Sequence, residues 1–457
     1  MSFARPDAQV RRCNPGKDDS ANGMEQTKMR EISTSNAAAR VHSFFQSLGD
    51  RIAAELGEGR EAISANLERV AATQLAAFNP SAHITHDDLV DYVLGAETLC
   101  KQSDLSSKFA EPPVSLYHGV DFDISALTWL DGTTSIHQHA FCGAFHVLAG
   151  SSIHCRYHFE PRQPPEPGQR AFTGRLQLRD LEVLHAGDTR VITRGSELIH
   201  SLFHMIRPSV TIVVRTINVD SADEIQYDYR WPGLAHDPFQ RHAPTTRKQQ
   251  YLRMLRLLDE DSALVHLQRV LADADLLLAY LLISEQARIS SDPDQARALA
   301  SMCTALPADE RELLFQAAHN DLLSQSVIDL RRKLHNPGHR YLLALLLNVF
   351  DRQELLRLVQ REFDAADPVD QVMTWIAEMT GNTERFENVI GLDFSNTELT
   401  MLAEMFRGSG LQAVLAKFSE RYGFEEVTLQ QEQLTALFTA LKTCALFHHI
   451  FVELPDR

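Results

Sequence analysis

The sequence predicts an α+β multidomain protein with a helical N-terminal segment, a central antiparallel β-barrel and an all-α C-terminal domain. Two changes of pattern along the chain support this prediction. Apolar residues recur every three or four positions up to about Cys100, as in amphipathic helices. From Pro112, short runs rich in Val, Ile, Phe and Tyr alternate with Gly, Pro and Asp, as in strands, and helical spacing returns at Thr245.

The first 110 residues divide into two expected regions. Residues 1–35 are polar and mix charges of both signs with Pro, Asn and Ser, so we expect a disordered tail. Residues 36–110 are expected to be helical, because Val41, Phe45 and Ile52 belong to an amphipathic stripe. Thr85 or Asp87 is a suitable cap for a later helix in this region.

Residues 112–220 are expected to form the β-barrel, since many short strands are typical of sandwiches and small barrels. The clearest strand is 152–160, where apolar and polar residues alternate strictly. Its polar face carries His154, Arg156 and His158. We expect this face to be solvated and the apolar face to point inward. The opposite arrangement, with Arg156 inside the barrel, stays open.

The last part of the chain is expected to be helical. Residues 221–244 contain Tyr227, Tyr229 and a Trp231-Pro-Gly sequence, and are interpreted as a linker arm. Residues 245–457 are expected to form a helical domain of stacked antiparallel pairs, punctuated by prolines. No clear repeat period is visible.

Composition limits the classes of function. The net charge of −17 argues against non-specific binding to nucleic acid or to an anionic membrane. The six cysteines include no CxxC pair, so a reducing cytoplasm is the expected location. We find no signal-peptide pattern and no apolar run long enough to cross a bilayer. P-loop, dinucleotide-binding, GxSxG and HExxH motifs are absent.

The most informative feature is a pair of histidines at the start of a strand-like run. His137 and His139 lie one residue apart between Gly132 and Gly150. Because side chains on a strand alternate, both point to the same face. A third histidine, His200, follows a Gly-Asp turn, a strand and a second glycine turn about sixty residues later. Three imidazoles can hold iron, copper, nickel or zinc.

These two segments resemble the metal-binding motifs of the cupin superfamily over roughly residues 114–219. The resemblance implies a small β-barrel with a metal held by His137, His139 and His200. It departs from the usual pattern where cupins carry a glutamate ligand, because that position falls on Gly143 or Ala144. A three-histidine site is the pattern of the thiol dioxygenases within the cupins. This resemblance implies Fe(II), with Zn, Ni or Mn as other candidates.

Candidate catalytic residues lie on the neighbouring strands. Arg156 or Arg215 is expected to pair with a substrate carboxylate, because a guanidinium binds a carboxylate bidentately. Tyr157 is a candidate because some thiol dioxygenases carry a Cys–Tyr crosslink near iron, although Cys142 is not at the matching offset. His146 and His204 are further candidates, interpreted mainly as structural or supporting residues.

The expected function is a metal-dependent cupin enzyme, a non-haem Fe(II) dioxygenase acting on a small thiol or other anionic substrate. Two alternatives are a metal- or ligand-sensing cupin whose helices bind a partner, and a Zn or Ni cupin isomerase or hydrolase. The expected partner is a small-molecule substrate, without nucleic acid or membrane. A homodimer, or a protein partner bound through the helical domain, is a further hypothesis.

Overall fold

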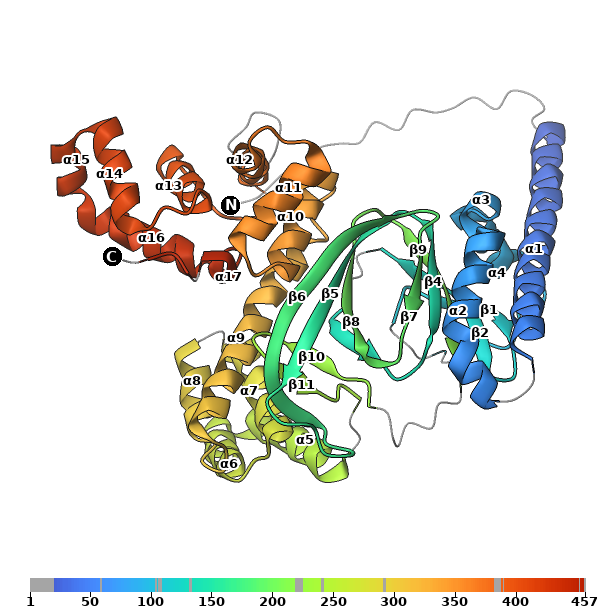
Figure 1. Cartoon of the computed structure of the whole chain (residues 1–457), viewed down its shortest axis with the longest axis horizontal. Helices are drawn as coiled ribbons and strands as arrows, with labels where there is room; N and C mark the ends of the chain where they lie inside the picture. Colours follow the sequence, from blue (N-terminus) through green and yellow to red (C-terminus); the bar gives the residue numbers. More distant parts are fainter. Residues whose placement is uncertain are drawn as a thin grey trace, which may run out of the picture.

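The computed structural model describes residues 20–57, 60–102, 105, 109–130, 134–217, 225–239, 242–290, 293–381, 388, 390–451 and 453–455. Helices flank a central pair of antiparallel sheets, which confirms the predicted α+β multidomain layout (Figure 1). Within the described part of the chain, no helix combines the length and the apolar character needed to cross a membrane.

Four helices form the N-terminal part: α1 (Ser20–Leu56), α2 (Arg60–Phe78), α3 (Pro80–His83) and α4 (His86–Gly95). The predicted stripe is buried, since Val41, Phe45 and Ile52 have no solvent-exposed surface. Thr85 caps α4, and its hydroxyl accepts a hydrogen bond from the Asp88 backbone N–H. α1 begins inside the predicted tail of residues 1–35, and residues 1–19 of that tail lie outside the described residues.

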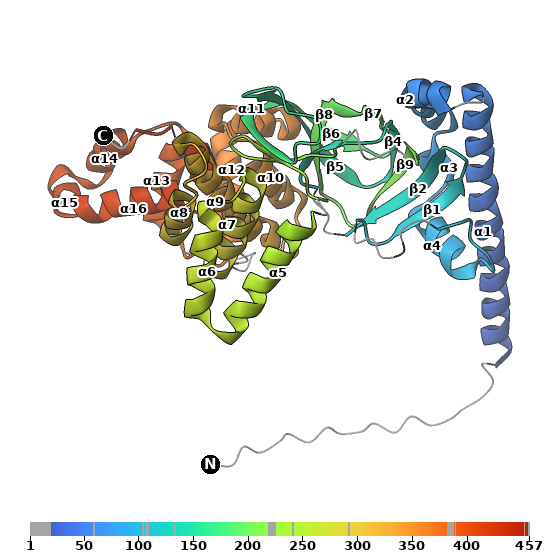
Figure 2. The ribbon, with the colours of Figure 1, turned by 90° about the horizontal axis from the view of Figure 1, so that it is seen from below.

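One sheet has five antiparallel strands in the order β1-β2-β9-β4-β7. Their bounds are β1 (Pro113–His118), β2 (Phe122–Trp129), β9 (Ser209–Thr216), β4 (Gly143–Ala149) and β7 (Thr189–Ile192). Ile124, Ala144 and Val214 point to one face and form a hydrophobic cluster with the N-terminal helices. Figure 2 shows these helices on one side of the sheet and the remaining strands on the other.

The other sheet closes into a six-stranded barrel in the order β10-β11-β6-β5-β8-β3. Its strands are β10 (Asp228–Arg230), β11 (Leu234–His236), β6 (Ala171–His185), β5 (Ser151–Pro161), β8 (Gly195–His204) and β3 (Ile136–His139). Residues 221–244 are therefore not simply a linker arm, because β10 and β11 join β3 to β6. Each of these two strands has only three residues, too few for an alternation to be visible in the sequence.

The two faces of β5 point opposite to the preferred sequence interpretation. Cys155 and Tyr157 lie in a cluster with the C-terminal helices, not between the sheets. The polar face looks toward the five-stranded sheet, because the His154 ring lies 5.9 Å from the Phe145 ring of β4. The expectation of a solvated polar face is therefore wrong for His154, which is 1% exposed, and holds only for His158 near the strand end. Alternation predicts two faces but not which one is covered.

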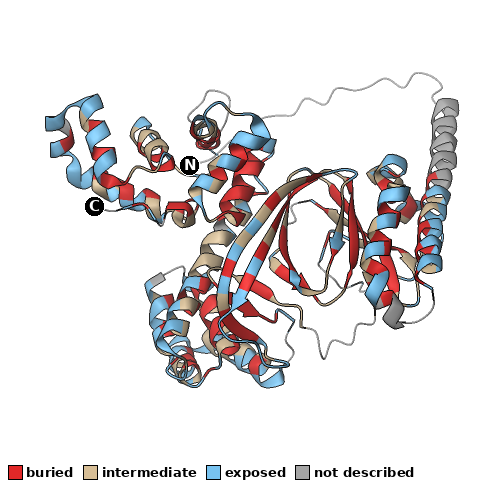
Figure 3. Ribbon diagram, in the orientation of Figure 1, coloured by how far each residue is buried: buried red, intermediate tan, exposed pale blue. Residues whose placement is uncertain are grey.

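The C-terminal part consists of helices. Their bounds are α5 (Ala243–Leu258), α6 (Glu260–Ala272), α7 (Leu276–Ser290), α8 (Pro293–Ser301), α9 (Ala308–Leu330), α10 (Pro337–Asn348), α11 (Arg352–Phe363), α12 (Pro368–Met379), α13 (Asn396–Phe406), α14 (Leu411–Tyr422), α15 (Phe424–Leu429), α16 (Gln431–Thr443) and α17 (His448–Phe451). One hydrophobic core includes barrel residues such as Tyr157 and helix residues such as Leu342. Figure 3 shows buried segments both in the barrel strands and in the C-terminal helices. Arg340 of α10 is fully buried and donates to the carbonyl oxygens of His204 and Met205.

The space between the two sheets holds a smaller apolar cluster. It contains Phe145 of β4, Val213 of β9 and Leu198 of β8. Because side chains alternate along each strand, the neighbours of these residues at a spacing of two also face this space. His200 on β8 and Arg215 on β9 are such neighbours, so both look into the space between the sheets.

Candidate metal centre

β3 and β8 bring the three predicted histidines together. His137 and His139 project from the same face of β3, as their spacing predicts. His137 lies directly opposite His200 in the antiparallel pairing of the two strands. Residues opposite each other in such a ladder share a face, so the strand register places the third imidazole beside the first.

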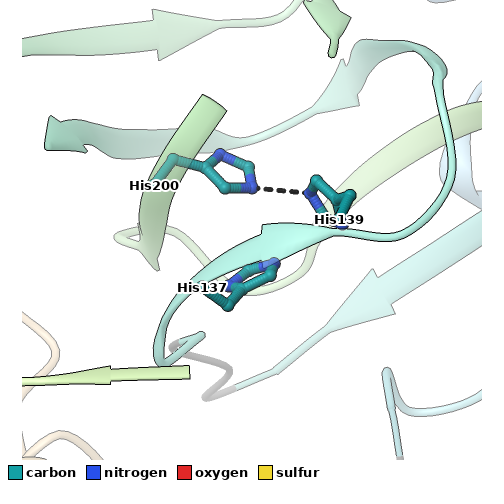
Figure 4. A group of neighbouring side chains, drawn as sticks. All are labelled: His137, His139 and His200. Carbon is teal, nitrogen blue, oxygen red and sulfur yellow. Dashed lines mark hydrogen bonds between the residues drawn. The ribbon is translucent and has the colours of Figure 1, made fainter. Parts of the chain in front are cut away.

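The three imidazoles converge on one point. One ring nitrogen from each of His137, His139 and His200 lies within 4.8 Å of the others. The Nε2 atoms of His139 and His200 are 2.9 Å apart and face each other (Figure 4). Two nitrogens bonded to one ion at about 2.1 Å lie about 3–3.4 Å from each other. The observed spacing is close to that of two ligands sharing an ion, so the donor set fits a divalent metal.

Hydrogen bonds identify the ligand atom of two of the rings. Nδ1 of His137 lies 2.8 Å from the carbonyl oxygen of Ser135, which can only accept a hydrogen bond. His137 therefore carries its proton on Nδ1 and keeps Nε2 free. Nδ1 of His200 lies 2.9 Å from Nε2 of His154, which leaves His200 Nε2 facing the centre. Bonds of this kind fix the tautomer and orientation of metal-binding histidines.

The protein environment keeps these imidazoles uncharged. Burial lowers the pKa of His137, and it lowers the pKa of His139 and His200 well below the usual value. The nearby imidazoles lower the pKa of His139 and His200 further, since adjacent positive charges would repel. Neutral imidazole is the form that binds metal, so the site is prepared for an ion near neutral pH.

The position of the missing glutamate is closed by the backbone of the neighbouring strand. A side-chain carbon added to Gly143 would lie 1.9 Å from the carbonyl oxygen of Val214. Ala144 points away, into the cluster with the N-terminal helices. Neither position can supply a carboxylate to the centre without moving β4. The three-histidine composition therefore follows from the packing of the sheet.

Of the two predicted arginines, one is already paired. Arg156 lies opposite His200 and faces the same space, but its Nε donates to Asp180 at 2.5 Å. Arg215 makes no ion pair within the described part of the chain. Its guanidinium lies 5.6 Å from the centre of the Phe141 ring, and that ring is 4.5 Å from the His139 ring. Arg215 is thus the better placed cation for a substrate.

Tyr157 is not brought to the centre. It lies on the face of β5 that packs against helices, and its hydroxyl is 3.3 Å from the carbonyl oxygen of Asn348. Cys142 belongs to a different hydrophobic cluster, beside the N-terminal helices. The prediction of Tyr157 as a catalytic residue is therefore wrong for this centre, and Cys142 is a buried free cysteine. The strict alternation that places His154 inside necessarily places Tyr157 outside.

Two other histidines lie outside the group of three. Nε2 of His146 accepts a hydrogen bond from the Ser81 backbone N–H at 3.4 Å, so His146 faces α3 and not the centre. His204 is fully buried, stacks on Trp129 with ring centres 4.7 Å apart and contacts Ser152 through Nδ1. Both have structural contacts of their own.

The residue that the sequence interpretation missed is His154. Its ring is buried beside His200, and its only sequence signal is the two-residue alternation of β5. Alternation placed it correctly on the face of Arg156. A polar strand face usually meets solvent, and the sequence does not show that another sheet covers this one.

No protein-family model matches the chain, and no curated protein matches it. Among solved structures, it is similar to an oxalate oxidase studied for structural and spectroscopic insights into its mechanism. The identity is 18% over 39% of this chain and 86% of that chain, with a TM-score of 0.19. A recombinant oxalate oxidase in complex with glycolate shows 19% identity over 37% of this chain and 80% of that chain, with a TM-score of 0.19.

A TM-score of 0.19 does not establish a common fold. The description of the fold therefore rests on this chain's own strands and their register. The antiparallel barrel and the group of three histidines are the features that the cupin resemblance implies.

Proposed function

We propose that this chain is a mononuclear metal-dependent enzyme of the cupin type, a non-haem Fe(II) dioxygenase that acts on a small thiol or another anionic substrate. The observation that carries the proposal is the convergence of three buried histidines in a group that contains no carboxylate. His137, His139 and His200 would hold the Fe(II) ion, which would supply the capacity to bind a substrate and dioxygen.

The charge of the centre favours an anionic substrate. Three neutral imidazoles contribute no negative charge, so a divalent ion keeps its full charge in a buried place. His137, His139 and His200 are 5%, 6% and 3% exposed, and electrostatic attraction is stronger where water is excluded. A thiolate or carboxylate would compensate this charge, whereas a neutral substrate would not.

Arg215 is the proposed anchor for a substrate carboxylate. It faces the space between the sheets and has no carboxylate partner among the described residues. Its guanidinium and the His139 ring both lie close to the Phe141 ring, so the arginine is near the histidines. A substrate with two anionic groups, one directed to the histidines and one to Arg215, would be oriented by both.

A second candidate is a metal- or ligand-sensing protein whose helices bind a partner. The observation in its favour is the continuous core from β5 and β8 to the C-terminal helices. A change at β8 has a packed route to the helices through His204, Met205 and Arg340. A Zn or Ni cupin isomerase or hydrolase is a third possibility with the same donor atoms.

Oxygen consumption separates these candidates. The protein is loaded with Fe(II) without air and then assayed in an oxygen electrode with small thiols, thiol-carboxylates and dicarboxylates. We expect substrate-stimulated oxygen uptake by the Fe(II) form and none by the Zn(II) form. Absence of uptake across the panel by protein that holds stoichiometric iron would exclude the dioxygenase and favour the sensor or the Zn or Ni enzyme.

A further inference from the structure

A chain of hydrogen bonds continues from His200 away from the metal centre. Nε2 of His154 lies 2.9 Å from Nδ1 of His200, and Nδ1 of His154 lies 3.1 Å from Oε1 of Glu182. Glu182 in turn accepts two hydrogen bonds from Arg190, from Nε at 3.0 Å and from the terminal Nη2 at 2.7 Å. The four side chains come from β8, β5, β6 and β7.

The strand register builds this chain. His154 and Glu182 are directly opposite each other in the β5–β6 pairing, so their side chains share a face. On the other side of β5, His154 is opposite Leu202, two residues from His200. Such diagonal neighbours lie within reach of long side chains. The contacts therefore follow from the sheet and not from a flexible loop.

With every imidazole in the neutral form, only one assignment of protons satisfies the whole chain. Glu182 keeps a low pKa because His154 and Arg190 donate to it, so it is a carboxylate that can only accept. His154 must then donate from Nδ1, and its Nε2 is a bare acceptor. His200 must donate from Nδ1 to that acceptor. The remaining nitrogen of His200, Nε2, is therefore unprotonated and faces His139.

We propose that His154 and Glu182 are positioning residues that hold His200 in its metal-binding tautomer and orientation. This inference rests on the proposed metal centre and adds an outer pair of residues to it. The pair supplies to His200 what the Ser135 carbonyl supplies to His137. The pair also places the Glu182 carboxylate two hydrogen bonds away from His200. The fold leaves no room for a carboxylate ligand at Gly143.

His154 does not act as a fourth ligand. Its Nε2 is engaged by His200 Nδ1, and its Nδ1 by Glu182, so neither ring nitrogen is free. The negative charge of Glu182 is balanced by Arg190, which donates two hydrogen bonds to it. The principal effect of the pair is therefore to orient the His200 ring. Its loss is expected to weaken metal binding without abolishing it.

The test measures metal affinity and stability separately in the full chain. His154→Phe removes the acceptor and keeps a ring, His154→Gln keeps an acceptor oxygen, and Glu182→Gln removes the charge. Glu160→Gln is the matched control, since Glu160 is exposed near the end of the same β5 strand. Dissociation constants for Zn(II) and Fe(II) come from competition with a chromophoric chelator, and Co(II) absorption reports ligand geometry. Thermal unfolding of each metal-free variant reports stability.

We expect His154→Phe to raise the dissociation constant about 10- to 100-fold, the usual effect of losing an outer hydrogen-bond partner. Glu182→Gln is expected near the lower end of that range, and His154→Gln should recover most of the affinity. The Co(II) spectrum should change in His154→Phe but not in Glu160→Gln.

Two results would overturn the assignment. If the wild type binds metal, Glu182→Gln binds it equally tightly, and His154→Phe either does the same or fails to fold, the pair has no positioning role. If affinity falls only in proportion to the melting temperature of the metal-free variants and the Co(II) spectrum is constant, the pair is merely structural. A wild-type chain without metal affinity would remove the proposed function as well.

Discussion

Arg215 and the three histidines have different expected roles in the site. The imidazoles are neutral and buried, and neighbouring acceptors orient those of His137 and His200, whereas Arg215 is half-buried and carries the positive charge. The histidines are expected to determine whether metal is held. Arg215 is expected to determine which substrates are oriented beside it.

Replacing Arg215 by Gln should weaken substrate binding more than metal binding. A charge-assisted hydrogen bond contributes about 1.5–3 kcal/mol, so KM for an anionic substrate should rise about 10- to 150-fold. Arg156→Gln is the matched comparison, because Arg156 is paired with Asp180 and should leave KM nearly unchanged. Steady-state oxygen uptake provides KM for both variants. A larger KM increase in Arg156→Gln than in Arg215→Gln would reverse the assignment.

The sequence predicted the three histidines from their spacing and from the glycines around them. It did not decide between Arg156 and Arg215, because that depends on the register in which the strands pair. Asp180, the partner of Arg156, lies on β6, and no pattern in the sequence connects the two. His154 and Glu182 were missed as a pair for the same reason.

At the level of elements, β4 explains why the centre has three ligands. The strand passes so close to β9 that Gly143 has no room for a side chain. Its alternation directs Ala144 and His146 to the N-terminal helices and Phe145 to the space between the sheets. Among these residues no carboxylate is available, and the strand cannot be shifted without losing the buried cluster.

Gly143→Ala should destabilise the fold. The added carbon would lie 1.9 Å from the Val214 carbonyl oxygen, at a φ of 157° that side chains rarely adopt. We expect a loss of about 2–4 kcal/mol in the free energy of unfolding, as for other overpacked buried positions. Urea unfolding of the metal-free protein measures it. Gly168→Ala is the control, because Gly168 also has a positive φ but nothing within 4 Å.

Equal effects of the two glycine substitutions would show that backbone conformation, and not close strand packing, governs position 143. The strand β5 itself was predictable, since its alternation is strict over 152–160. Which face of it was covered was not predictable, because α10 is far away in sequence and β4, although it directly precedes β5 in the chain, belongs to the other sheet.

At the level of the whole molecule, the barrel and the C-terminal helices share one core. Tyr157 and Phe203 of the barrel pack in the same cluster as Leu342 and Phe451 of the helices. The change of pattern near residue 245 was visible in the sequence. The shared core was not, because leucine-rich helix faces give no indication of the surface they cover.

The buried histidines make stability dependent on pH. Burial lowers the pKa of His204 and His236 to about 3 and of His146 to about 4, while an unfolded histidine titrates near 6.5. Below that value the unfolded chain binds protons that the folded chain does not. Stability should therefore fall as pH decreases from about 6.5, by up to about 1.4 kcal/mol per unit for each such histidine.

Urea unfolding of the metal-free protein at pH 7.5, 6.0 and 5.0 measures this dependence. The free energy of unfolding should change little between 7.5 and 6.5 and decline steeply below. A constant value down to pH 5.0 would show that these histidines are not held neutral. Carboxylates with a lowered pKa, such as Glu182, would lose their contribution to the free energy of unfolding only at more acidic pH.

The central claim is that His137, His139 and His200 hold one metal ion, and the metal content of the full chain tests it most directly. Wild-type protein, His139→Ala and the control His158→Ala, an exposed histidine on the polar face of β5, are reconstituted with Fe(II) without air and freed of excess ion. We expect about one iron per chain in the wild type and in His158→Ala, and background iron in folded His139→Ala, since loss of a direct ligand should exceed the roughly 10- to 100-fold cost of losing an outer partner. Stoichiometric iron in His139→Ala, or none in the wild type, would contradict the account.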